Sequence, residues 1–405
     1  MFNRFLHASR VATDPLTVAP SAGKTASPLG PAEIESEPVN QTASRDLAVA
    51  SQWRLMWTKF RRHRLAMICG AIVILLYVVA IFVEVLAPYG PNSQEARDAY
   101  HPPTGIHIRD ENGAFHLPFV YGTSSKRNLD TLELEFVDDT SQRFPLGFFA
   151  QGEPYELWGV IPWDRHIVGI EGSDAKMFLL GADQQGRDLL SRVIYGTRIS
   201  MSIGLIGVAA SFLIGVAIGG VSGYFGGRID IIFQRVIEFI RSIPTIPLWL
   251  GISAALPSDW SVLRIYLAIT VILSLIGWTG LAQVVRGRTL ALREEDFVMA
   301  ARLSGTSQRR IIFRHLVPSF MSHIIAALTL AVPEMIIAET SLSFLGLGLQ
   351  SPAISWGVLL QDAQNLRSVA SAPWLLVPGA FVVLAVLTLN FFGDGLRDAA
   401  DPYRR

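Results

Sequence analysis

Two glutamates, Glu334 and Glu339, lie five residues apart inside a long apolar stretch of the chain. If that stretch crosses a membrane, such a carboxylate can relay a proton or meet a polar solute, or it can hydrogen-bond to a neighbouring helix. Glu238 and Arg241 are spaced so that they can pair on one face of a helix. The sequence therefore gives six candidates to line a pore: Glu238, Arg241, Pro244, Thr245, Glu334 and Glu339.

Two short motifs suggest nucleotide binding, but neither is complete. "AGKT" at residues 22–25 contains the end of the phosphate-binding pattern G-x-x-x-x-G-K-[ST], yet the first glycine would fall at Val18, in a proline-rich tail. "GLGLQS" at residues 346–351 lacks the third glycine of a dinucleotide loop and is predicted to be a turn. The histidines are scattered without ligand spacing, and Cys69 is the single cysteine. We expect no cofactor, no metal site and no enzymatic activity.

A basic segment, "MAARLSGTSQRRIIFRHLVP" at residues 299–318, interrupts the apolar chain. Small and apolar residues recur at helical spacing up to Gly305, which suits the left-handed position after a helix end. A second helix is predicted over residues 308–316 and is expected to end at Pro318. Its arginines offer planar charged donors to a carboxylate-bearing partner. The segment predicts a helix-turn-helix that docks in a protein groove, or else an amphipathic helix on lipid headgroups.

These candidates must be positioned by helices in a membrane. Half of the 405 residues are hydrophobic and only 17% are charged, against about 25% in soluble domains. The composition predicts an integral membrane protein in contact with lipid, and its zero net charge does not favour nucleic acid. Because prolines and charges inside spans are tolerated beside a cavity, the third and fifth spans are expected to line one. The six expected spans cover residues 65–87, 200–222, 231–256, 263–285, 320–345 and 374–392.

Arginine and lysine predict the orientation. "KFRRHR" at residues 59–64 precedes the first span and places the N-terminus in the cytoplasm, and six spans return the C-terminus to the same side. The loop at 286–318 carries seven arginines against three acidic residues, which agrees with a cytoplasmic position. Four regions follow: a disordered cytoplasmic tail (1–48), an amphipathic lead-in with the first span (49–88), an external insert (89–179) and a core with five spans and the basic loop (180–405).

Several blocks resemble a known family. Ala300, Ala301 and Gly305, followed by "HLVP" at 315–318, are similar to the EAA loop of ABC-importer permeases, with Met299 at the position of its glutamate. Three further blocks resemble dipeptide/oligopeptide permeases: "LGADQQGRDLLSRVIYGTRISMSIG" at residues 180–204, "SLSFLGLGLQSPAISWGVLL" at 341–360 and "GDGLRDAADPYRR" at 393–405. The resemblance covers about residues 50–88 and 180–405.

Taken together, the apolar runs and the resemblance predict an all-α polytopic membrane protein with six transmembrane helices and a cytoplasmic helix-turn-helix coupling element. The strand-like stretches of residues 89–179 predict a small β-rich external insert, which is longer than the family plan requires. The resemblance implies a permease subunit of an ATP-driven, binding-protein-dependent importer in the bacterial inner membrane, forming half of a pore for peptides or similar solutes. The implied partners are a homologous permease subunit, two ATP-binding subunits and an external solute-binding protein. The residues implied to couple to the ATPase are Ala300, Ala301, Gly305, Arg309, Arg310 and Pro318.

Three alternatives stay open from the residues. The same scaffold could import oligosaccharides or opines, the intramembrane carboxylates could serve a secondary transporter, or the insert could be a membrane-anchored sensing domain. The insert contains an aromatic run, "RFPLGFFAQGEPYELWGVIPWDRH" at residues 143–166. Its rings are expected to form the insert's own core or an interfacial belt, or else the insert's outer face helps to seat the binding protein.

Overall fold

The computed structural model describes residues 52–400, apart from residues 112, 128–133, 171–174 and 258. The expected tail at residues 1–48 and the last five residues of the closing block therefore lie outside the described residues. The chain divides into two units, Met1–Ala50 and Ser51–Arg405, and everything below concerns the second.

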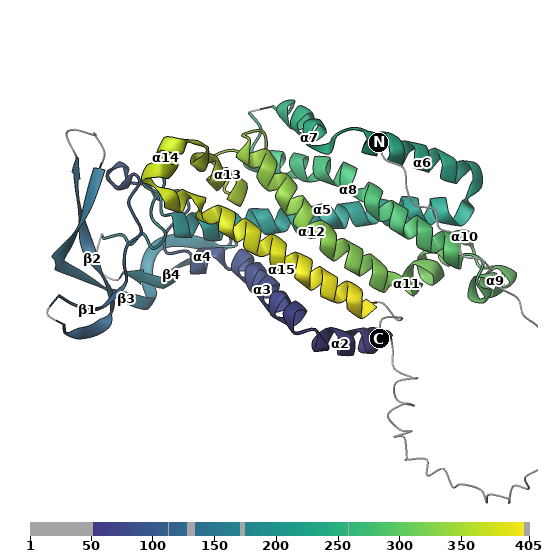
Figure 1. Cartoon of the computed structure of the whole chain (residues 1–405), viewed down its shortest axis with the longest axis horizontal. Helices are drawn as coiled ribbons and strands as arrows, with labels where there is room; N and C mark the ends of the chain where they lie inside the picture. The colour runs from purple at the N-terminus through teal and green to yellow at the C-terminus, as the bar shows by residue number, and fades with distance from the viewer. Residues whose placement is uncertain (1–51, 112, 128–133, 171–174, 258, 401–405) are drawn as a thin grey trace, which may run out of the picture. The chain divides into compact units, whose positions relative to one another are not determined.

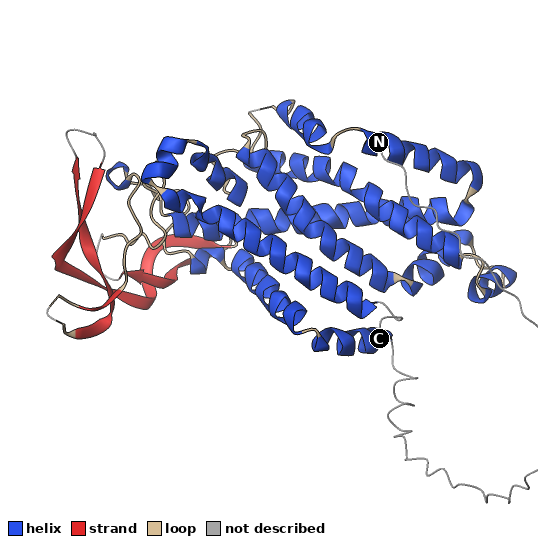
Figure 2. Ribbon diagram, viewed as in Figure 1, coloured by secondary structure: helices blue, strands red, loops and turns tan. Residues whose placement is uncertain are grey.

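Five helices among the described residues are long and apolar enough to cross a membrane, and a bent pair can supply a sixth span. Figure 1 and Figure 2 show these long helices lying lengthwise against one another. The five are α3 (Arg64–Ile81), α5 (Leu189–Phe225), α8 (Val262–Leu292), α12 (Met321–Phe344) and α15 (Val377–Ala400), the last preceded by the 3₁₀ turn η4 (Pro373–Leu376). The bent pair is α6 (Gly227–Ser242) and α7 (Thr245–Ala254).

The third expected span, residues 231–256, is not one continuous helix. The axes of α6 and α7 differ by 80° across the break between them. Pro244 lacks a backbone N–H and restricts the residue before it to extended backbone, and Ile243 has φ −84° and ψ 128°. The first expected span, residues 65–87, is interrupted as well, because α3 ends at Ile81 and a short α4 (Val83–Leu86) follows.

Glycines bring α5 and α8 into close contact. Gly215, Gly219 and Gly223 are spaced by four residues and therefore lie on one face of the 37-residue helix α5. A Cβ atom at Gly219 would lie 2.4 Å from the carbonyl oxygen of Ala282, and one at Gly223 would lie 2.7 Å from that of Arg286. Small residues at such spacing let the backbones of two membrane helices touch, and this contact joins α5 to α8 along several turns.

Shorter elements connect the long helices. The helices are α2 (Gln52–Arg62), α9 (Asp296–Leu303), α10 (Gln308–Arg310), α11 (Val317–Ser319), α13 (Trp356–Gln361) and α14 (Leu366–Ser371). The 3₁₀ turns are η1 (Ala96–Asp98) and η3 (Asp362–Gln364), and η2 (Ile311–Leu316) is a π-helix.

A four-stranded antiparallel sheet occupies the region between α4 and α5, in the order β1–β2–β3–β4 (Figure 2). Its strands are β1 (His107–Arg109), β2 (Phe115–Arg127), β3 (Leu134–Leu157) and β4 (Ile161–Ile170). The 24-residue β3 pairs with β2 over its first part and with β4 over its second part. A small apolar cluster contains Val120, Ile170 and Met177, with Phe144 and Leu146 packed against it. Because Met177 belongs to the segment that leads into α5, this cluster holds the sheet against that segment.

Candidate functional site

The basic segment forms two helices joined by a tight turn. After α9, the Gly305 N–H donates to the Arg302 carbonyl at 3.0 Å and the Thr306 N–H donates to the Ala301 carbonyl at 3.1 Å. Gly305 has φ 75°, the left-handed conformation expected for a glycine that closes this pair of hydrogen bonds. The turn therefore fixes the angle at which the second helix leaves the first.

The second helix departs from the expected geometry in its last part. It was predicted to end at Pro318, but α10, the π-helix η2 and α11 run on as far as Phe320, where φ is −121°. A proline ring clashes with the carbonyl four residues earlier in a regular α-helix, and the wider turn of a π-helix relieves that crowding. Phe320 alone separates α11 from α12, which begins at Met321.

One face of this two-helix segment is buried against the membrane helices. Arg302 of α9 contacts the Tyr224 ring at the end of α5. The guanidinium carbon lies 5.0 Å from the ring centre, which is in the range of a cation–π contact. The apolar cluster shared by α9, η2 and the ends of α5 and α8 contains Val298, Ala301, Ile311, Ile312, Leu316, Val216, Leu281 and Val285.

An ion pair ties three helices together beside this segment. Arg286 of α8 donates through Nε and Nη2 to the two carboxylate oxygens of Asp230 on α6, each at 2.5 Å. Ser222 of α5 donates its hydroxyl to the same carboxylate, also at 2.5 Å. Two-point contacts between arginine and a carboxylate are both strong and geometrically selective, so this ion pair fastens α8 to α6, and the Ser222 hydroxyl fastens α5 to the same carboxylate.

The opposite face of the segment is open. Ala300, Gly305, Arg309, Arg310 and Pro318 are exposed, whereas Ala301 points inward. Four large apolar side chains were missed as site residues and stand out beside the arginines: Phe297, Met299, Leu303 and Phe313, with Leu303 88% exposed. Leu303 lies two positions after the inward Ala301, about 200° around the helix, and this spacing is the signal that would have placed it outside. Phe297, four positions before Ala301, had no such signal.

The pore candidates on the bent pair are exposed, but their predicted pairing is wrong. Glu238 forms its ion pair with Arg235, at 2.8 Å, and not with Arg241. Arg241 donates instead to the side-chain oxygen of Gln283 on α8, because that neutral acceptor lies on the helix packed beside it. Pro244 and Thr245, at the bend, are exposed.

The two carboxylates of α12 lie in different environments. Glu334 is exposed, whereas Glu339 is fully buried. Serine hydroxyls donate to the Glu339 carboxylate from Ser343 at 2.8 Å, from Ser355 at 2.7 Å and from Ser200 at 3.4 Å. In this structure Glu339 joins α12 to α5 and to the start of α13, and its carboxylate does not face a surface.

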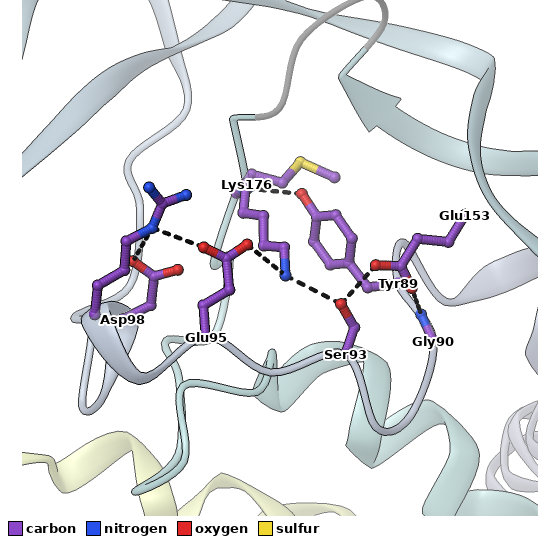
Figure 3. Close-up of polar contacts among 9 residues, drawn as sticks. Tyr89, Gly90, Ser93, Glu95, Asp98, Glu153 and Lys176 are labelled. Atoms are coloured by element: carbon purple, nitrogen blue, oxygen red, sulfur yellow. Dashed lines mark hydrogen bonds and ion pairs between the residues drawn. The ribbon is translucent and has the colours of Figure 1, made fainter.

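A polar chain lies where the sheet meets the segment after α4 (Figure 3). Lys176 contacts a Glu95 carboxylate oxygen at 3.1 Å and donates to the Ser93 hydroxyl at 3.0 Å. Ser93 in turn donates to Glu153 at 2.5 Å, and the Gly90 N–H donates to the same carboxylate at 2.9 Å. Burial raises the pKa of Glu95, but the ammonium of Lys176 and the guanidinium of Arg97 together outweigh burial, so the net pKa is lowered.

This polar chain borders a cavity of about 870 Å³ lined by Tyr89, Glu95, Glu153 and Lys176 among others. The Tyr89 hydroxyl accepts a hydrogen bond from the Met177 N–H at 2.7 Å, and burial raises its pKa well above the usual range. Because the charged groups named here already have partners, the arrangement serves to fasten the sheet to the segment that follows α4.

The long apolar helices define a multi-pass membrane protein, and its short helix-turn-helix exposes a face with basic and apolar side chains. In Figure 1 the helix-turn-helix and the sheet lie at opposite ends of the helices. The family model described as "Binding-protein-dependent transport system inner membrane component" matches residues 215–405, and that described as "N-terminal TM domain of oligopeptide transport permease C" matches residues 51–103. The chain belongs to this family of binding-protein-dependent inner membrane transport components.

Curated relatives agree with this assignment. The dipeptide transport system permease protein DppC of Bacillus subtilis is 40% identical over 227 residues, which cover 56% of this chain and 68% of the relative. The oligopeptide transport system permease protein OppC of Haemophilus influenzae is 41% identical over 226 residues, covering 56% and 70%. The OppC protein of Escherichia coli K12 is 40% identical over 226 residues, covering 56% and 72%. The resemblance inferred from the sequence blocks is thereby confirmed.

Proposed function

We propose that this chain is the permease subunit of an ATP-driven importer and that the helix-turn-helix at residues 296–319 transmits the motion of separate ATP-binding subunits to the pore. The observation that carries the proposal is its two-sided construction. One face is buried against α5 and α8, and the other presents Leu303 and Phe313 beside Arg309 and Arg310 to a partner. Short helices with apolar and charged side chains on one exposed face dock in protein grooves.

The route from this surface to the membrane helices is short. Phe320 alone lies between the segment and α12, so a rotation of the segment acts directly on the helix that carries Glu334. The Arg286–Asp230 pair carries the same displacement to α6, which leads into the bend at Pro244. The docking element is therefore joined to α12 and to α6, and we propose that movement of these two helices opens and closes the pore.

The proposal includes an orientation in the membrane and a set of partners. The basic loop and "KFRRHR" support a cytoplasmic position for the docking surface and for both termini, and the sheet is then external. A pore needs a second half, which a homologous permease subunit would supply. Glu238, Arg241, Pro244, Thr245 and Glu334 are exposed and are proposed to face it.

Peptides are the proposed cargo, delivered by an external solute-binding protein, because the relatives carry the names of dipeptide and oligopeptide permeases. A secondary transporter is disfavoured by the position of Glu339, which is satisfied by three serines inside the bundle. The coupling roles of Ala300, Gly305, Arg309, Arg310 and Pro318 are proposed through the exposed face, and that of Ala301 through packing beneath it.

The docking surface is tested with Leu303→Asp in the full-length chain, co-expressed with its ATP-binding subunits. Leu303 is 88% exposed, so the change should leave folding intact while placing a charge in the docked interface. Co-purification of the ATP-binding subunits should fall at least about tenfold, as expected for a loss of about 1.4 kcal/mol. Leu117→Asp, at a 79% exposed position on the sheet, is the matched control and should change nothing. Full retention with Leu303→Asp would contradict the proposal.

The turn geometry gives an independent test. A side chain at Gly305 would meet no described atom within 4 Å, so a substitution acts through the backbone at φ 75° alone. Gly305→Val should impose a penalty of about 1–2 kcal/mol and lower transport at an unchanged membrane level of the protein. Gly305→Asn, which tolerates this conformation, should transport like the parent. If the two variants behave alike, the angle of the turn has no part in coupling.

A further inference from the structure

The end of the β3–β4 hairpin exposes apolar side chains that the sheet does not use. We call Trp158, Val160, Ile161 and Trp163 the hairpin tip. Val160 is 79% exposed, and both tryptophans are about half exposed. Phe144, earlier in the same aromatic run, packs against the cluster inside the sheet. Of the two arrangements expected for the aromatic run, the core of the insert or an interfacial belt, the hairpin tip therefore does not fit the first.

The hairpin tip is held against the end of the first span. The Trp158 indole N–H donates to the Ile81 carbonyl at 2.8 Å, and its ring centre lies 5.8 Å from that of Phe82. Trp158 has φ 55°, an uncommon conformation for a bulky residue. Such a conformation persists where surrounding contacts hold it, so the tip is fixed in place at the point where α3 ends.

Arg198 of α5 supports the same place from the other side. Its guanidinium donates to the carbonyls of Ala80 and Ile81 at 3.0 and 3.1 Å and to both oxygens of Glu84 at 2.6 and 2.7 Å. The carbonyls left free where α3 stops are thus satisfied by Arg198 and by Trp158. This is the chemistry of a helix end at a membrane boundary, where backbone groups need partners.

The neighbouring face of α3 identifies the medium around the tip. No charged residue lies between Arg64 and Glu84, and the exposed side chains of α3 include Ile74 at 66% and Leu75 at 59%. An apolar exposed face on a spanning helix is covered by lipid chains. Ile81 and Phe82 continue this exposed apolar surface to the hairpin tip.

We infer that the hairpin tip lies in the interfacial layer of the outer leaflet, in contact with phospholipid, and that the insert is thereby anchored to the membrane as well as to the helices. Tryptophan is enriched at that level of membrane proteins because its ring is apolar and its N–H is polar. A cavity of about 490 Å³ beside the tip is lined by Tyr77, Ala80, Ile81, Trp158, Gly159 and Leu205, and also by Ser202 and the Glu84–Arg198 ion pair. At this depth an acyl chain is the available occupant. The inference rests on α3 being a membrane span, and the choice of the outer leaflet rests on the proposed orientation; neither depends on the proposed coupling.

The test measures what surrounds Val160 in the full-length chain, in nanodiscs of phosphatidylethanolamine and phosphatidylglycerol. With Cys69→Ala removing the single native cysteine, a nitroxide label is placed by Val160→Cys. Collision with oxygen, which partitions into lipid, is compared with collision with a water-soluble nickel chelate. Leu117→Cys is the water-facing control, since Leu117 on β2 is equally exposed at 79%, and Ile74→Cys on α3 is the lipid-facing control.

The oxygen-to-nickel ratio at Val160 is expected to be several-fold higher than at Leu117 and to approach that at Ile74. A ratio equal to that at Leu117 would place the tip in water and overturn the inference. Low accessibility to both reagents would mean that protein covers the tip, and would also overturn it. Because neither ATP-binding subunits nor transport enters this measurement, its failure leaves the coupling proposal untouched.

Discussion

The contact between α5 and α8 should be intolerant of a single added methyl group at Gly219. A Cβ atom there would lie 2.4 Å from the Ala282 carbonyl oxygen and 2.9 Å from the Val285 Cβ. Ordinary contacts between carbon atoms are about 3.5–4.0 Å, and the nearest obstacle is backbone that cannot rotate away. Gly219→Ala therefore requires the two helices to separate or shift, which loosens the packing on both sides of that level.

The magnitude follows from two opposing effects. Overpacking of this kind costs about 1–3 kcal/mol, while alanine is favoured over glycine inside a helix by up to about 1 kcal/mol. We expect a net loss of about 1–2 kcal/mol for Gly219→Ala. Gly280→Ala, on α8, is the matched control because a Cβ there meets no described atom within 4 Å. It should be neutral or slightly stabilising.

The single cysteine provides the assay. Cys69 is buried in α3, so a thiol-reactive fluorogenic maleimide reports the temperature at which the bundle opens in detergent. The midpoint should fall by a few degrees in Gly219→Ala and should not fall in Gly280→Ala. Equal midpoints for Gly219→Ala and the parent, or an equal fall in both variants, would refute the close contact between α5 and α8.

Two further predictions use the same assay. Arg286→Lys should destabilise the protein by about 1 kcal/mol, because a lysine cannot form the two-point contact with Asp230. Arg286→Ala should destabilise the protein by more. An unchanged midpoint in Arg286→Ala would contradict a stabilising role for the ion pair. Burial raises the pKa of Asp188, just before α5, to about 6, and its Oδ1 has no hydrogen-bond partner among the described residues. Because the pKa of Asp188 in the folded protein lies above its ordinary value, protonation stabilises the native state. This group should therefore raise the unfolding midpoint as the pH falls from 7 to 5, and the rise should be absent in Asp188→Asn.

Sequence reasoning located the helix-turn-helix because its signals are local. The N–H groups of Gly305 and Thr306 donate to carbonyls three and five positions before them, respectively, and a single chain segment therefore holds the information. The extent of the second helix was misjudged for a related reason. Pro318 disfavours a regular α-helix, but whether a chain stops there or widens into a π-helix depends on packing, and Ile311, Ile312 and Leu316 are buried against α5 and α8.

Breaks in the spans were harder to predict because hydropathy measures only the apolar length. Pro244 signalled a disturbance in the third span, yet the 80° bend reflects how α6 and α7 pack on neighbouring helices. The end of α3 at Ile81 had a weaker signal still, since Phe82 and Val83 are apolar. The partners that stabilise this break, Arg198 and Trp158, come from residues more than 70 positions away.

For the two carboxylates of α12, helical geometry predicts a difference that composition alone does not. Residues five apart on a helix are separated by about 140° around its axis, so Glu334 and Glu339 cannot share one narrow face. Ser343, one turn after Glu339, can reach it, whereas Ser200 and Ser355 come from other parts of the fold. Only the assembled bundle decides which glutamate is enclosed. Because Glu339 is enclosed by serines and Glu334 is exposed, Glu334 is the carboxylate of α12 that we propose to face the pore.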